Sequence, residues 1–191
     1  MKGRRAARRL ALDVLYEAEI RGRPPVEAFL EREHHGWVIP AAEDTLDPPE
    51  ALLEGDSTSD RLGDRDGKET SDRLGDRDGK ETSDRLGDRD GQEQEVVGYA
   101  RGLVAGVQEH QAHIDELIVK YAERWGLQRM PVVDRTVLRM ATWELLWGED
   151  IPVAVAINEA VELVKALSTD DSGRFVNGVL GRIAEGKSAR A

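Results

Sequence analysis

Apolar residues recur every three or four positions in several separate stretches of the chain, which is the spacing of an amphipathic helix. The first stretch covers residues 4–20 and ends before Gly22, and a shorter one begins at Pro24 and Pro25. Further stretches of this kind lie at residues 96–107, 113–125, 131–150, 152–167 and 171–183. No stretch alternates convincingly with the period of a strand. The pattern therefore predicts an all-α fold of about six or seven helices.

A tandem repeat interrupts this helical pattern. The sequence SDRLGDRDGKET occupies residues 59–70 and recurs unchanged at 71–82, and SDRLGDRDG returns at 83–91. Each copy carries one leucine among glycines and alternating charges, so it cannot bury enough apolar surface to offset the entropy of ordering. A solenoid would need a buried face in every copy. We therefore predict that residues 55–94 are disordered.

The predicted organisation is a single helical domain with an acidic insert. Its parts are the first helices at 1–37, the insert at 38–94, the remaining helices at 95–185 and a tail at 186–191. Residues 41–95 contain 19 acidic and 8 basic residues, which leaves 19 of each sign elsewhere from totals of 38 and 27. The net charge of −11 therefore belongs to residues 41–95 alone, and it does not describe the rest of the chain.

Basic residues gather at the start of the first predicted helix. On a helical wheel, Arg4, Arg5, Arg8 and Arg9 form a stripe beside the apolar face, and Tyr16 falls in the same arc. Such a stripe suits a phosphate backbone and a stacked base, and the helix N-terminus adds partial positive charge. The alternative is an ordinary solvated face. We favour nucleic-acid binding because four arginines lie within six residues.

A second candidate site lies in the sequence DDSGRFVNG at residues 170–178. Asp171 or Ser172 can cap the last predicted helix, which places Arg174 and Phe175 in its first turn. A phosphate could meet the arginine there while a base stacks on an exposed ring. The alternative is a plain helix start with Phe175 in the core. Periodicity alone favours the core.

Residues that could carry catalysis or hold a metal ion are sparse. The chain has no cysteine, no phosphate-binding loop and no glycine-rich cofactor motif. His110 and His113, with acidic residues nearby, could face a metal ion, but such sets are common on exposed helices. The acidic pair Glu159 and Glu162 is more simply explained as helix surface or an interhelical contact than as a general acid and base. We expect no catalysis, no cofactor and no metal.

Composition also argues against a membrane or secreted protein. The mean hydropathy is −0.54 and the chain contains no long apolar run. The N-terminal stretch is basic, but Asp13, Glu17 and Glu19 interrupt its apolar positions, so it is not a secretory signal. The absence of cysteine fits a reducing compartment. These features predict a soluble cytoplasmic protein.

Several segments together resemble the NusB family of bacterial transcription antitermination factors. They are RRAARRLALDVLYEAEI, VVDRTVLRMATWELL and, above all, VAINEAVELVK followed by STDDSGRFVNGVL. The resemblance covers residues 1–33 and 95–185 and leaves out the insert and the tail. It implies two packed helical subdomains that bind boxA RNA as a heterodimer with the ribosomal protein NusE. That heterodimer joins NusA and NusG on RNA polymerase and supports transcription of ribosomal RNA operons.

The resemblance also implies roles for individual residues. The family's RNA-binding positions correspond to Arg4, Arg5, Arg8, Asp171, Arg174 and Phe175. Positions associated with the NusE surface correspond to Tyr16, Tyr121 and Asp134. On this basis we expect the ring of Phe175 to be exposed, although periodicity alone favours the core. The repeats depart from the family pattern, and Arg9 stands where relatives often carry a glutamate.

Two alternative functions remain open at this point. The same helical module resembles the N-terminal domain of ribosomal RNA cytosine methyltransferases, but this sequence ends at Ala191 without a glycine-rich cofactor loop. The other alternative is a helical protein–protein adaptor, or a homodimer that hides the arginine stripe. RNA binding should weaken steeply with salt, whereas an apolar helix interface should not.

Overall fold

The computed structural model describes residues 2–36, 81–123, 125–148 and 151–188. Within these ranges every regular element is helical, which confirms the all-α prediction. The elements are α1 (Lys2–Arg21), α2 (Pro25–His35), α3 (Glu81–Tyr121), the short 3-10 helix η2 (Leu127–Arg129), α4 (Val132–Trp147), α5 (Val153–Leu167) and α6 (Ser172–Ser188). None of the described helices is long and apolar enough to span a membrane.

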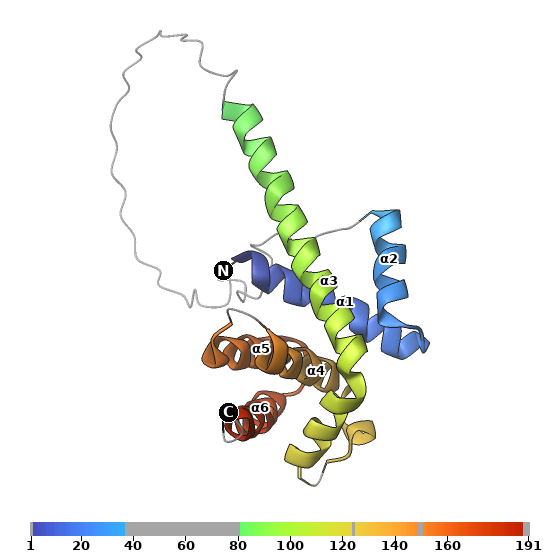
Figure 1. Cartoon of the computed structure of the whole chain (residues 1–191), viewed down its shortest axis with the longest axis vertical. Helices are drawn as coiled ribbons and strands as arrows, with labels where there is room; N and C mark the ends of the chain where they lie inside the picture. Colours follow the sequence, from blue (N-terminus) through green and yellow to red (C-terminus); the bar gives the residue numbers. More distant parts are fainter. Residues whose placement is uncertain (1, 37–80, 124, 149–150, 189–191) are drawn as a thin grey trace, which may run out of the picture.

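The helices form two groups around one core. Helices α1, α2 and α3 pack on one another, and α4, α5 and α6 form the second group. Contacts of α1 and α3 with α4 join the groups, and one continuous cluster of buried apolar side chains runs through both. Figure 1 shows α3 as the longest element, with its N-terminal end projecting beyond the other helices. This arrangement brings the start of α1 against α4 and α5.

Helix α1 follows its sequence pattern closely. Ala7, Leu10, Val14 and Ala18 recur on one face, and all four are buried. The helix ends at Arg21, and the next residue, Gly22, has a φ of +63° that an L-residue rarely adopts. This turn leads the chain from α1 to α2.

Helix α3 is longer than the sequence predicts. The two expected helices at 96–107 and 113–125 fall in one continuous element that ends at Tyr121 and has five glycines along it. Gly106 is required because a Cβ atom at this position would collide with the indole of Trp143 on α4. The glycine therefore marks a close helix–helix contact, and it does not mark a break.

The predicted start of this helix near residue 95 is also wrong, because α3 begins at Glu81 and includes the third copy of the repeat. Extending an existing helix costs much less than nucleating one, so weakly helical residues can continue a helix that the core stabilises. At the other end of the chain, α6 continues to Ser188 and takes in the start of the predicted tail. The remainder of the predicted insert, residues 38–80, lies outside the described residues.

Candidate nucleic-acid interface

The arginines at the start of α1 contact acidic residues of α4 and α5. Arg8 is only 4% exposed, and its Nε donates to Glu144 Oε1 at 2.9 Å and to Oε2 at 3.1 Å. Its Nη1 lies 3.7 Å from Oε2 of Glu159. The structure therefore does not place Arg8 in a solvent-facing stripe. Its charge is neutralised inside the protein, where it holds α1 against α4.

Tyr99 on α3 contacts Glu144 and the two arginines Arg4 and Arg8. Its hydroxyl donates to Glu144 Oε1, and the guanidinium carbons of Arg4 and Arg8 lie 5.4 and 5.8 Å from its ring centroid. Burial raises the pKa of Glu144 above its ordinary value, despite the opposing effects of Arg8 and the Tyr99 hydroxyl. Burial and the neighbouring carboxylate also raise the pKa of Tyr99. The hydroxyl therefore stays protonated and acts as a donor.

Arg5 lies closer to the surface. Its Nε and Nη2 donate to the two carboxylate oxygens of Glu159 at 3.1 and 3.0 Å, and its side chain is 41% exposed. Arg9 contacts Asp13 one turn further along α1 at 3.4 Å. We name the group of Arg4, Arg5, Arg8, Tyr99, Glu144 and Glu159 the α1 cluster. Of the predicted arginines in this cluster, Arg4 and Arg5 are the partly exposed ones.

The start of α6 is fixed by a buried polar contact. Ser172 is 2% exposed, and its hydroxyl donates to Oδ2 of Asp134 at 2.7 Å. The same hydroxyl oxygen accepts a hydrogen bond from the backbone N–H of Thr169 at 3.3 Å. Asp134 is 3% exposed, so the residue predicted to face NusE lies inside the protein and fixes α6 on α4. Asp171, one position before Ser172, is exposed.

Arg174 and Phe175 lie in the first turn of α6, as predicted. Arg174 is exposed. Phe175 is half-buried, since one part of its ring packs on the core. Its ring centroid lies 5.8 Å from that of Trp125, at an interplanar angle of 44°. Trp125 was not among the predicted site residues, because it falls at the end of the helical stretch expected at 113–125 and has no local signal of its own.

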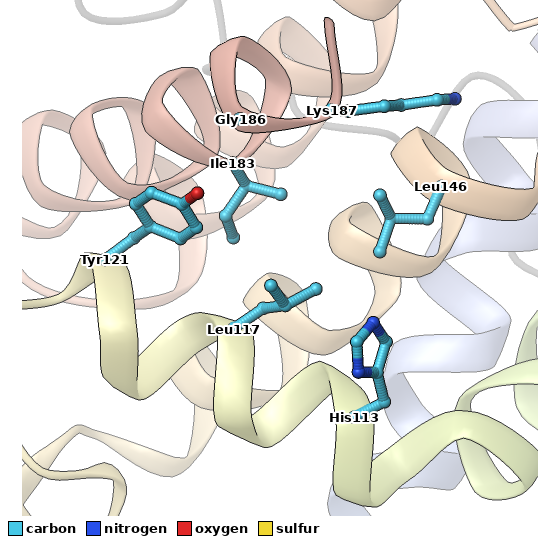
Figure 2. Close-up of a pocket in the computed structure, with 7 residues that line it drawn as sticks. All are labelled: His113, Leu117, Tyr121, Leu146, Ile183, Gly186 and Lys187. Atoms are coloured by element: carbon cyan, nitrogen blue, oxygen red, sulfur yellow. The ribbon is translucent and has the colours of Figure 1, made fainter. Parts of the chain in front are cut away.

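The two tyrosines assigned to partner binding lie in different hollows. Tyr16 is 41% exposed and lines an open groove of about 400 Å³ together with Ile20 and charged residues of α1 and α2. Tyr121 lines a pocket of about 290 Å³ between α3, α4 and α6, shown in Figure 2. The lining residues of this pocket are His113, Leu117, Tyr121, Leu146, Ile183, Gly186 and Lys187. The structure therefore does not unite Tyr16, Tyr121 and Asp134 in one surface.

The histidines considered as metal ligands instead flank an aromatic ring. His110 stacks on Trp147 with ring centroids 4.1 Å apart, and His113 meets the same ring edge-on at 6.0 Å. In the described part of the chain, no group of three or more histidine or acidic side chains is arranged to hold a metal ion. The two glutamates weighed as an acid–base pair are separately engaged, Glu159 with Arg5 and Glu162 with Lys165.

Comparisons with known proteins agree on one family. Residues 68–185 match the model of the NusB family. The chain is 41% identical over 185 residues to the transcription antitermination protein NusB of Salinispora arenicola, which covers 97% of each chain.

Solved structures show the same fold. A structure of T. maritima NusB is 30% identical, covers 95% of this chain and 90% of its own, and superposes with a TM-score of 0.60. A structure of the antitermination factors NusB and NusE in complex with dsRNA is 24% identical, with coverages of 97% and 98% and a TM-score of 0.60. The second likeness concerns the fold alone.

Proposed function

This chain belongs to the NusB family, and from that premise we propose that it binds boxA-type RNA together with NusE and acts in transcription antitermination. The observation that carries the proposal is the likeness to an antitermination protein over 97% of both chains, and the family model also covers the start of α6. In this proposal the protein works in the cytoplasm, without catalysis, as part of a complex with RNA polymerase, NusA and NusG.

The proposed RNA contacts come from two places on the surface. At the first, Arg4 and Arg5 are partly exposed, and their guanidinium groups are suited to phosphate oxygens. At the second, exposed Arg174 follows the N-terminus of α6, whose backbone N–H groups add partial positive charge. Phe175 offers part of its ring beside it, and Asp171 offers a carboxylate. Arg8 contributes indirectly by holding the start of α1 in position.

The proposed NusE surface centres on the groove at Tyr16. An exposed tyrosine and the 60% exposed Ile20 lie there among charged side chains, which is the composition of an interface with an apolar centre and a polar rim. Asp134 contributes by fixing α6 on α4. Tyr121 lines a separate pocket, so we propose that its effect on the partner is also indirect.

The test is binding of boxA RNA and of a scrambled RNA, each with and without purified NusE, at two salt concentrations. Specific binding that NusE strengthens and that falls steeply with salt supports the proposal. Equal affinity for the two RNAs, or no binding under any condition, would contradict it. The absence of binding under every condition would make a helical adaptor or a homodimer the better description.

A further inference from the structure

Trp125 and Phe175 form a two-ring surface that no sequence feature indicated. Trp125 lies in the connection between α3 and η2, and its side chain remains 51% exposed. Its ring is tilted by 44° to that of Phe175, so the two rings form a bent surface and do not stack face to face. A tryptophan usually loses more of its area than this on folding, because burying a large ring is strongly favourable.

Hydrogen bonds fix the backbone on both sides of Trp125. The backbone N–H of Trp125 donates to the Ala122 carbonyl at 3.3 Å, and Glu123 adopts a left-handed φ of +54°. Buried Arg135 donates from Nη1 to the Leu127 carbonyl at 2.7 Å, and its Nη2 lies 2.6 Å from Oε1 of Glu19. The backbone that follows Trp125 is therefore tied to α1 and α4 through Leu127. A backbone fixed in this way needs less ordering when a ligand stacks on the ring.

The charged groups around the rings favour an unpaired nucleotide over an apolar protein segment. Exposed Arg174 precedes Phe175, and exposed Arg129 follows Trp125 by four positions. Glu123, the acidic residue nearest to Trp125 in the sequence, forms an ion pair with Arg182. Asp171 is exposed at the start of α6, where its carboxylate can accept a hydrogen bond from a base amino group. Aromatic rings flanked by arginines are the arrangement on which single-stranded nucleic acids stack.

We propose that Trp125 is a base-stacking residue of the RNA site and extends it from Phe175 across the connection between α3 and η2. The inference rests on the proposed function, since it assumes that RNA reaches the start of α6. Its ligand is one unpaired nucleotide of the bound RNA, next to the nucleotide at Phe175. Stacking alone tolerates any base, so Trp125 adds affinity and does not read sequence.

The experiment compares Trp125→Ala, Trp125→Phe and a control, Leu30→Ala, in complexes with boxA RNA and NusE. Leu30 lies on α2 and is also 51% exposed, so its truncation removes a similarly exposed apolar side chain elsewhere. We expect Trp125→Ala to weaken RNA binding about tenfold, since loss of one stacking side chain has an effect of this order. Trp125→Phe retains a ring and should stay within about threefold of the parent. Leu30→Ala should bind as the parent does.

Tryptophan fluorescence provides a readout that a purely structural role would not change. Addition of RNA should quench the parent protein, and the quench should shrink in Trp125→Phe although this variant still binds. An unchanged quench in Trp125→Phe, or full RNA affinity in Trp125→Ala, overturns the inference. Full RNA affinity with weakened NusE binding would assign the rings to a protein surface and overturn it too. If the parent does not distinguish boxA from scrambled RNA, the proposed function fails first and the inference fails with it.

Discussion

The α1 cluster and the start of α6 use arginine in opposite ways. Arg8 is buried and donates twice to Glu144, whereas Arg174 is exposed in the first turn of its helix. Both residues belong to segments that we propose as RNA-binding. The difference teaches that an arginine in a proposed binding segment can either position a helix or contact the ligand directly. The residues that surround it decide which role it has.

The two regions should also respond differently to substitution. When one member of a buried ion pair is removed, the other charge stays buried without a partner. Its removal should therefore lower the free energy of unfolding. An exposed arginine contributes little to the free energy of unfolding, so its removal should mainly lower the affinity for RNA. The following predictions test this contrast, from the largest expected effect to the smallest.

Removal of Arg8 should have the largest effect. Arg8→Ala leaves the Glu144 carboxylate buried without its main partner, and we expect a loss of about 3–5 kcal/mol in the free energy of unfolding. Urea denaturation followed by circular dichroism measures this change. Arg174→Ala serves as the matched control and should stay within about 0.5 kcal/mol of the parent. Similar stability losses in the two variants would contradict the contrast between the regions.

Removal of Arg174 should reduce RNA binding without loss of stability. We expect Arg174→Ala to weaken binding of boxA RNA about tenfold, because a phosphate contact made by an exposed guanidinium is lost. The dependence of log affinity on log salt should also become shallower, by roughly 0.7 to 1 for the lost contact. Titrations at several salt concentrations give both quantities. A weaker affinity with an unchanged slope would show that Arg174 does not contact a phosphate.

The raised pKa of Glu144 makes the stability of the α1 cluster depend on pH. Its carboxyl faces Arg8 of α1, Tyr99 of α3 and Glu159 of α5, and burial has the largest effect on its pKa. As the pH rises above the ordinary value of 4.5, the unfolded chain ionises this group first, so the folded state holds the extra proton. The contribution of Glu144 to stability is therefore fully present below that pH and decreases above it.

The comparison of the parent with Glu144→Gln isolates this contribution. The glutamine does not titrate, and other acidic groups cancel in the difference between the two proteins. The free energy of unfolding of the parent, relative to the variant, should decrease as the pH rises above 4.5. A difference that stays constant above this pH would show that the pKa of Glu144 is not raised in the folded protein.

Removal of one copy of the repeat should have the smallest effect. Residues 59–70 form one full copy of the repeat and lie outside the residues that the structure describes, and their composition predicts disorder. Deletion of residues 59–70 then shortens a long loop by one copy, which changes its closure free energy by about 0.3 kcal/mol. Thermal melting and RNA affinity should match the parent. A clear loss of either would show that this copy makes contacts that stabilise the protein or its complex.

The hydrophobic pattern of the sequence determined the helical class and most of the helix positions. It did so because a helix that packs on a core repeats its apolar residues with a fixed period, which is visible without any knowledge of its neighbours. The segments at 4–20, 155–165 and 168–180 carry the resemblance to the family, and the arginines at 4–9 and the sequence at 170–178 indicated the two candidate RNA-binding regions. The positions of Arg174 and Asp171 at an exposed helix start were predictable on this basis.

Only the tertiary structure decided which of these residues reach the solvent. Arg8 meets Glu144 across 136 positions of sequence, and Ser172 meets Asp134 across 38, so neither contact has a local signal. The ring pair of Trp125 and Phe175 likewise joins two separate elements. A helical wheel assigns each side chain a direction, but burial and charge neutralisation depend on what another helix places in that direction.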